Sequence, residues 1–190
     1  MDRKHGTPTV LPVSSVRVVT ENEGESALVQ IALFDGLPAT GAAKLLHPCC
    51  ASRRWVGEMI SGRPYGSIRR LIGASDDIVA DLQWSDIAEA LAAHPRIGDR
   101  VGGADKESGW SRQEQSGVAD STVADQLVRG NLAYETRFGH VFLICASGRS
   151  AAGMLTALQE RLTNPTAVER EVVRDELRAI VRLRLIKTFR

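Results

Sequence analysis

The chain has 190 residues, of which 43% are hydrophobic and 25% are charged, and this balance suits one compact soluble domain. A formal net charge of +1 gives no electrostatic support to a general role in binding nucleic acid or an acidic membrane surface. No apolar run approaches the roughly 20 residues of a membrane span, and the basic N-terminus lacks the features of a signal peptide. The three cysteines lack the regular spacing of a secreted disulfide framework. We therefore expect a cytoplasmic protein.

The first half of the chain predicts a tail followed by helices. Residues 1–25 mix Pro, Ser, Thr, Gly and Glu without clear periodicity, and we interpret them as a loosely ordered tail. From residue 26 onward, apolar residues recur at helical spacing over 26–34, 38–46 and 52–60, and again after Pro64. Ser85 is a candidate N-cap for a helix that ends near Ala93. The glycine-rich stretch 99–110 then predicts a loop.

The second half predicts further helices and one ambiguous segment. Ser111 and Glu114 have the spacing of a capping box, and so do Thr166 and Glu169 ahead of a long terminal helix. Helical composition also covers 121–138 and 149–162. The apolar run VFLICA, 141–146, fits either a buried strand-like segment or a helix start. We predict an all-α fold, with residues 26–190 forming a single compact multi-helix domain.

The terminal helix places one arginine among apolar residues. At 100° per residue, Arg184 falls within the stripe formed by Val173, Leu177 and Ile180. The spacing predicts a separate, solvated face for Arg174, Arg178 and Arg182. A buried guanidinium needs an anionic partner, because it cannot lose its proton. Arg184 therefore forms an internal salt bridge, snorkels to the surface, or binds the carboxylate of a ligand.

A histidine ends the alanine-rich helix that precedes Pro95. His94 continues the stripe of Ile87 and Leu91, which puts its ring at the edge of the core. One interpretation is a structural histidine with its hydrogen bonds satisfied. The other is a proton donor, since a helix C-terminus favours the imidazolium and the imidazole titrates near neutral pH.

The sequence gives little support to other kinds of site. HPCC, 47–50, contains three possible metal ligands, but adjacent cysteines rarely bind one zinc ion and no CxxC motif accompanies them. The motifs of nucleotide-binding loops and of a serine nucleophile elbow are also missing. We therefore expect no metal.

Five segments, taken together and in order, resemble a known family. They are PCCASRRW (48–55), HPRIG (94–98), SRQEQ (111–115), NLAYETRFGHVFLICASGRS (131–150) and the arginine within RLRL (182–185). The set is similar to the 2-oxo-4-hydroxy-4-carboxy-5-ureidoimidazoline (OHCU) decarboxylases of urate degradation, over roughly residues 28–189. The resemblance implies an all-α, cofactor-free carboxy-lyase, typically a homodimer, that produces (S)-allantoin from a small-molecule substrate.

The resemblance also assigns site residues. His94 matches the catalytic proton donor, and Glu114 and Arg184 match residues that hold the substrate for catalysis. The implied substrate-binding residues are Pro95, Ser111, Arg112, Gln113, Glu114, Gln115, Phe142, Leu143, Ile144, Cys145, Ala146 and Arg184. Backbone groups of 142–146 are expected to meet the planar ring.

The chain departs from the family pattern just before this last segment. The family commonly has FGFPF where this chain has FGHVF, so His140 and Val141 replace an apolar residue and a proline. A non-catalytic helical binding module descended from such an enzyme is the alternative. The joint presence of His94, Glu114, Gln115 and Arg184 favours the enzyme.

Overall fold

The computed structural model describes residues 21–97 and 121–190, and within these ranges the regular elements are all helices. The helices are α1 Glu21–Gly36, α2 Ala39–Leu46, α3 Arg53–Ser61, α4 Ile68–Asp81, α5 Trp84–Ala92, α7 Ser121–Phe138, α8 Ala151–Arg161 and α9 Thr166–Thr188. The all-α prediction is confirmed for this part of the chain. In the same ranges, the structure contains no helix with the length and apolar character that crossing a membrane requires.

Serine side chains fix the starts of three helices. Ser52, Ser67 and Ser150 accept hydrogen bonds from the backbone N–H three residues later, at 3.3, 3.3 and 3.1 Å. Each bond satisfies one of the donors that a helix leaves unpaired at its N-terminus, and such a cap contributes about 1 kcal/mol. These local signals explain why the helices begin where they do.

Three predicted helix starts differ from the structure. Helix α1 begins at Glu21, so the predicted boundary of the tail at residue 25 falls inside a helix. Ser85 is not the N-cap of α5, because Gln83 occupies that position and its N–H donates to Asp86 Oδ2 at 3.0 Å. The capping box at α9 is also wrong: Pro165 is the N-cap, without a side-chain hydrogen bond, and Glu169 is fully buried.

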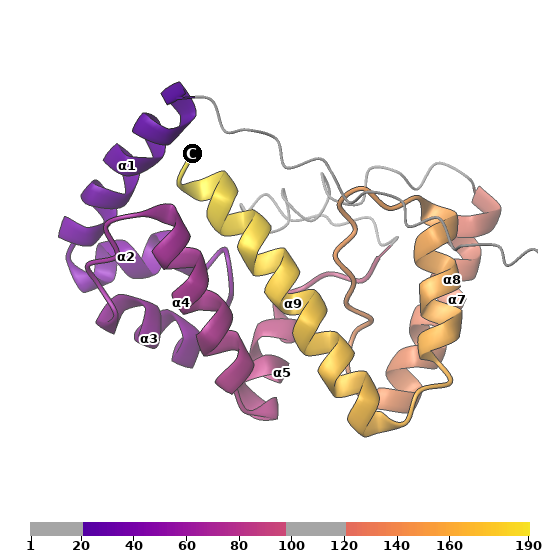
Figure 1. The fold of residues 1–190 in the computed structure, drawn as a ribbon. Coiled ribbons are helices and arrows are strands. Elements are labelled where there is room, and N and C mark those ends of the chain that lie inside the picture. Colours follow the sequence, from indigo (N-terminus) through magenta and orange to yellow (C-terminus); the bar gives the residue numbers. More distant parts are fainter. Residues whose placement is uncertain (1–20, 98–120) are drawn as a thin grey trace, which may run out of the picture.

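Two apolar clusters form the core, and α9 runs past both groups of helices (Figure 1). The larger cluster joins side chains of α1–α5 to α9, and the smaller one is built mainly from α7 and α8. Helix α4 packs against α9, and α7 packs against α8. The chain between α7 and α8 passes between α9 and this second pair (Figure 1). Because α9 lies centrally, its inward-facing residues can reach several elements.

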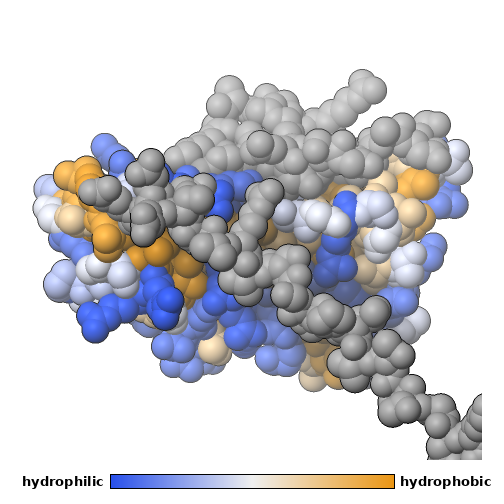
Figure 2. Space-filling view, turned by 45° about the horizontal axis from the view of Figure 1, so that its top comes forward, coloured by the Kyte–Doolittle hydropathy of each residue, from blue (hydrophilic) through white to orange (hydrophobic). Residues whose placement is uncertain are grey.

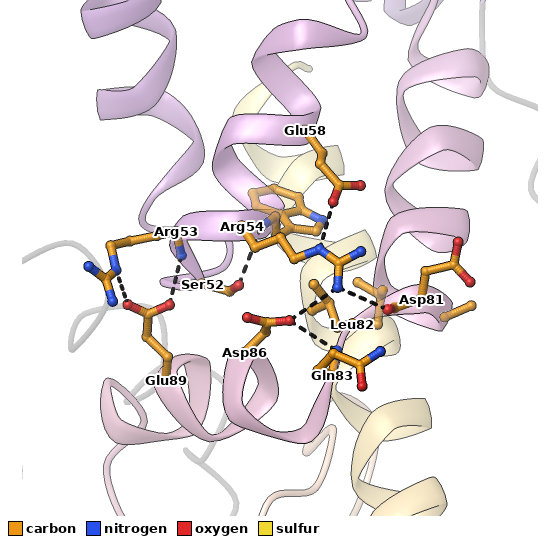
Figure 3. A network of polar contacts seen from close by, with 12 residues as sticks. Ser52, Arg53, Arg54, Glu58, Asp81, Leu82, Gln83, Asp86 and Glu89 are labelled. Atoms are coloured by element: carbon orange, nitrogen blue, oxygen red, sulfur yellow. Dashed lines mark hydrogen bonds and ion pairs between the residues drawn. The ribbon is translucent and has the colours of Figure 1, made fainter.

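A polar network anchors α5, the helix that precedes His94, to α3 (Figure 3). The backbone N–H and the Nε of Arg53 both donate to Glu89, at 3.0 and 2.5 Å. Arg54 donates to Glu58 at 2.7 Å and to Asp86 at 3.3 Å. These groups are largely exposed, so each ion pair is worth little alone. Their joint effect is to fix the orientation of α5.

Arg174 corrects the prediction that the arginines of 174–182 share a solvated face. Its side chain is only 18% exposed, and Nη1 donates to the carbonyls of Val79, Ala80 and Leu82 at 2.8–3.1 Å. These carbonyls end α4 and would otherwise lack helical partners. Arg174 thus ties the C-terminal end of α4 to α9.

Candidate functional site

His94 lies two residues past the end of α5, with its ring mostly inside the protein. Its Nδ1 is 2.9 Å from the carbonyl oxygen of Ala90. A carbonyl only accepts, so this contact requires the proton on Nδ1 and leaves Nε2 with a lone pair in the neutral ring. Nε2 is buried and has no hydrogen-bond partner within residues 21–97 and 121–190. The structure therefore presents an acceptor nitrogen next to the core.

The charge of His94 differs from the sequence prediction. Burial, together with the nearby Arg184 guanidinium, lowers the pKa of His94 to about 4, although the bond to Ala90 favours protonation. The prediction that the helix end favours the imidazolium is therefore wrong, since desolvation and a neighbouring cation outweigh the helix dipole. At neutral pH His94 is an uncharged imidazole that can accept a proton.

Arg184 lies where the helical stripe predicted. Val173, Leu177, Ile180 and Arg184 are all buried on the inner face of α9, and Arg184 is only 2% exposed. Its Nη1 donates to the carbonyl oxygen of Pro48 at 3.3 Å, just beyond α2. The Arg184 guanidinium acts electrostatically on the imidazole and, after burial, is the second cause of the lowered pKa of His94. Thus α5 and α9 bring together two site residues separated by 90 positions in the sequence.

The segment 141–146 has no regular secondary structure, but its side chains alternate as in a strand. Val141, Leu143 and Cys145 pack against the larger cluster. Phe142, Ile144 and Ala146 belong to the smaller one. Alternation with a period of two is the signature of an extended chain, here buried on both sides. The strand-like interpretation of VFLICA is the one that the structure supports.

Neighbouring side chains bind the backbone of this segment along one edge. Arg161 Nη1 donates to the carbonyl of Leu143 at 2.7 Å. The N–H of Cys145 donates to Glu176 Oε2 at 2.7 Å, and its carbonyl accepts from Arg149 Nε at 3.2 Å. In an extended chain, the N–H and C=O of one residue point to one edge, and those of the next residue point to the opposite edge. The N–H and C=O of Ile144 therefore face away from these partners.

The buried ion pair of Arg161 and Glu169 supports the segment 141–146. Glu169 is fully buried and accepts from Arg161 at 2.6 and 2.8 Å, from Asn164 at 2.7 Å, and through a short bond from Tyr134. The Arg161 guanidinium also lies 4.6 Å from the centre of the Phe142 ring. The fourfold hydrogen bonding explains how an unexposed carboxylate is tolerated. This network joins α7, α8 and α9 to the segment.

The turn after His94 is attached to α7. Arg96 donates to both carboxylate oxygens of Glu135 at 2.5 and 2.8 Å, and Asn131 Nδ2 donates to the carbonyl of Ile97 at 2.7 Å. Pro95, a predicted substrate contact, lies between His94 and these anchors and is partly exposed. Helix α7 thus holds the turn through Asn131 and Glu135, and the segment 141–146 through Tyr134.

The residues of FGHVF that depart from the family pattern fill an aromatic cluster. The His140 ring meets Trp84 and Tyr134 edge-on, with centroid distances of 5.0 and 5.4 Å. Burial lowers the pKa of His140, so this ring also favours the neutral form. Val141 packs against the larger cluster. His140 and Val141 therefore both contribute to packing in the segment just before Phe142.

Sequence reasoning missed several residues that shape the site. Glu169 lies four residues before Val173 on the stripe that singled out Arg184, so the same argument would have placed it in the core. For Arg161, Tyr134 and Glu176, the sequence carries no comparable signal, because their partners come from distant elements. The predicted binding residues Ser111, Arg112, Gln113, Glu114 and Gln115 lie outside the described residues. Where the structure is described, it groups no three His, Cys, Asp or Glu side chains as a metal site.

Comparisons with known proteins identify similar chains. A 35% identical relative, the uric acid degradation bifunctional protein TTL of Arabidopsis thaliana, aligns over 74% of this chain and 45% of its own length. The chain thus spans less than half of that protein. The 2-oxo-4-hydroxy-4-carboxy-5-ureidoimidazoline decarboxylase of Amia calva is 30% identical, over 73% of this chain and 78% of that protein.

Solved structures and a family model extend the match. An OHCU decarboxylase crystallised in the presence of (S)-allantoin superimposes with a TM-score of 0.67 and 31% identity, covering 75% of this chain and 95% of that one. An (S)-allantoin synthase shares the fold at 18% identity, with a TM-score of 0.61 over 83% of this chain and 53% of that one. The OHCU decarboxylase family model matches residues 35–186. The chain therefore belongs to the OHCU decarboxylase family.

Proposed function

We propose that this protein decarboxylates 2-oxo-4-hydroxy-4-carboxy-5-ureidoimidazoline and forms (S)-allantoin. The observation that carries the proposal is the pairing of a half-buried His94, whose Nε2 is a buried acceptor, with the buried cation of Arg184. A cation suits the anionic substrate, an uncharged imidazole can accept its hydroxyl proton, and peptide groups suit its ring N–H and C=O groups. Family membership supports the same reaction.

The substrate supplies its own electron acceptor. Its carboxylate is attached to a carbon next to an imine-like C=N bond. When the bond to CO2 breaks, the electron pair forms a new C=C bond and the imine nitrogen takes the displaced pair together with a proton. This chemistry needs no external electron sink of the kind that pyridoxal phosphate supplies. The protein has to hold the ring and control the protons.

His94 then moves the proton that decides the stereochemistry. Its Nε2 accepts the proton of the substrate hydroxyl while the carboxylate is still present. After CO2 has left, the oxygen becomes a carbonyl and the C=C electron pair takes a proton on the adjacent carbon. Delivery of that proton by the His94 imidazolium, from one side only, gives a single enantiomer. This order of events begins with a neutral imidazole, and the neutral form follows from the lowered pKa of His94.

Arg184 couples the departure of CO2 to this proton transfer. While the substrate carboxylate is present, its negative charge offsets the guanidinium and lets His94 accept a proton. Once neutral CO2 has left, the Arg184 charge again disfavours the imidazolium and promotes proton donation to carbon. A tight grip on the carboxylate alone would stabilise the ground state and slow the reaction. Arg184 therefore acts through its charge as well as by binding.

Further substrate contacts complete the proposal. We assign Pro95, Ser111, Arg112, Gln113, Glu114 and Gln115 to one wall of the site, and Phe142, Leu143, Ile144, Cys145 and Ala146 to the other, on the family resemblance. On the second wall, Ile144 is the residue whose peptide groups face away from the anchoring side chains. The catalytic residues proposed are His94, Glu114 and Arg184.

The rate of substrate decay tests this proposal. Freshly formed substrate, generated from urate, should lose its carboxylate much faster with the protein than without it, and one CO2 should be released per allantoin. Arg184→Lys keeps the charge but loses the planar fork, so we expect a reduced rate that still exceeds the spontaneous decay. A decay at the spontaneous rate with the wild-type protein would refute the function.

We also propose a cytoplasmic homodimer, following the family resemblance. The cysteines among the described residues are thiols and form no disulfide, as is usual in a reducing compartment. Leu28, Val29 and Leu33 of α1 are 54–62% exposed, and Figure 2 shows hydrophobic residues at the end of the molecule where α1 lies. An exposed apolar surface of this kind suits a contact with a second copy. Light scattering should give twice the chain mass for the wild type, and Leu33→Glu should give the monomer mass.

A further inference from the structure

We propose that Glu176 is a positioning residue that fixes the peptide group of Cys145 and thereby orients the substrate-facing edge of segment 142–146. The inference rests on the decarboxylase function proposed above. It adds a residue from the middle of α9 that does not itself touch the substrate.

The contacts at Cys145 enclose its backbone. Glu176 Oε2 accepts from the Cys145 N–H at 2.7 Å, and Arg149 Nε donates to the Cys145 carbonyl at 3.2 Å. Arg149 Nη2 also lies 3.7 Å from Glu176 Oε1, so the two side chains pair with each other. A donor and an acceptor of opposite charge thus bind the same residue.

The strength of these contacts depends on charge and burial. A hydrogen bond to a carboxylate is about twice as strong as one between neutral groups. The Glu176 side chain is 16% exposed, whereas Arg149 is 48% exposed. Water therefore screens Arg149 more, and the bond from the Cys145 N–H to Glu176 is the stronger restraint.

The opposite edge of the segment gains its orientation from this restraint. Because the Cys145 N–H and the Ile144 C=O belong to one peptide plane and point in opposite directions, fixing the Cys145 N–H on one edge directs the Ile144 carbonyl to the other. Arg161 donates to the Leu143 carbonyl on the same edge as Glu176 and so adds a second restraint on the segment. The Cys145 N–H is used by Glu176, so ring recognition falls to the Ile144 side.

Helix α9 links this restraint to Arg184. The two residues are eight positions apart on one helix, a rise of about 12 Å. A single rigid element therefore sets both the backbone edge that meets the ring and the cation beside His94. Loss of the hydrogen bond between Glu176 and Cys145 would move the backbone edge and leave the Arg184 cation in place.

The test compares Glu176→Ala and Glu176→Gln with Glu171→Ala, a change on the same helix that removes an exposed ion pair to Arg174. Steady-state kinetics on freshly generated substrate gives KM and kcat for each variant. Amide hydrogen exchange at Cys145, followed by NMR, reports the restraint without reference to activity.

Removal of the carboxylate should speed exchange of the Cys145 amide about tenfold or more, as the loss of a charge-assisted hydrogen bond predicts. KM should rise about tenfold in Glu176→Ala, with a smaller change in Glu176→Gln, whose amide oxygen can still accept. Glu171→Ala should match the wild type in both measurements. An active wild type together with an unchanged KM or an unchanged Cys145 exchange rate in Glu176→Ala would overturn the inference. An inactive wild type would refute the proposed function, on which the inference rests.

Discussion

The proposed chemistry depends on the imidazole of His94, and its neutral form has a definite origin. Burial removes water from the ring, and the Arg184 guanidinium adds an unfavourable charge, so the pKa of His94 falls to about 4. The hydrogen bond to the Ala90 carbonyl fixes the tautomer with Nε2 as the acceptor. Two electrostatic effects thus keep the ring neutral, and one hydrogen bond leaves Nε2 as its acceptor atom.

This electrostatic environment predicts the pH dependence of the reaction. The acid limb of kcat/KM reports the free enzyme's base, so kcat/KM should stay nearly constant from pH 7.5 to 5.5 and fall only near pH 4. A tenfold fall per pH unit beginning at pH 6.5 would contradict the neutral His94.

Removing the neighbouring cation should shift this titration. In Arg184→Gln the imidazolium loses a repulsive charge, so the pKa of His94 should rise. NMR titration of the ring would measure the shift, with the signal assigned by its loss in His94→Gln. An unchanged pKa would show that Arg184 does not act on His94.

The same group links stability to pH. The pKa of His94 is about 4 in the folded state and near 6.5 in the unfolded chain, so the unfolded state binds more protons between these values. The wild type should lose about 3 kcal/mol of unfolding free energy from this group as the pH falls from 6.5 to 4. Urea unfolding of His94→Gln should lack this component. Parallel curves for the two proteins would contradict the shift.

The sequence located these residues but did not give their charge state. Arg184 was identifiable because an arginine among Val173, Leu177 and Ile180 conflicts with the helical pattern. The charge of His94 was not predictable, since it depends on Arg184, which only the tertiary fold brings near. Glu169 shows that a local rule can mislead: its position after Thr166 fits a capping box, yet its side chain lies in the core.

At the scale of elements, α7, α8 and α9 act as a frame for the segment 141–146. Tyr134, Arg161 and Glu169 come one from each of these helices and meet in a buried network. The same apolar run was ambiguous in the sequence because both of its faces are buried, which removes the alternation of polar and apolar residues. Only the assignment of its side chains to two clusters shows that it is extended.

Breaking the buried ion pair should destabilise the whole protein. Arg161→Met leaves the Glu169 carboxylate unexposed without its cation, at a cost of about 3–5 kcal/mol in unfolding free energy. Arg178→Met, which removes an exposed pair with Asp175 on α9, is the control, with an expected change of about 0.5 kcal/mol or less. Urea unfolding measures both. Equal changes in the two variants would contradict a structural role for the network.

The packing of α7 on α8 makes a second prediction. A Cβ at Gly130 would lie 2.4 Å from Leu158 Cδ2, so Gly130→Ala should cost about 1–3 kcal/mol through overpacking. At Gly57 in α3 a Cβ meets nothing within 4 Å. There the same substitution should stabilise the helix by up to about 1 kcal/mol. Thermal unfolding distinguishes the two, and a stabilised Gly130→Ala would show that the helices are not in close contact.

At the scale of the whole molecule, the proposed site draws on the turn after α5, on α9 and on the segment 141–146. Helix α9 runs between the two groups of helices (Figure 1), and its central position explains how one helix carries Arg184, Glu176 and Glu169 toward different partners. The all-α class was predictable from apolar periodicity, because it is a local property. The meeting of distant segments was not, apart from the family resemblance.

The most direct test of the central claim is the enantiomeric excess of the allantoin formed from freshly generated substrate. If His94 delivers the proton from one side, the wild-type protein should yield nearly pure (S)-allantoin, whereas His94→Ala should yield product close to racemic. Circular dichroism of the product during the reaction measures both. Racemic allantoin from the wild type, or equally pure (S)-allantoin from His94→Ala, would contradict the account.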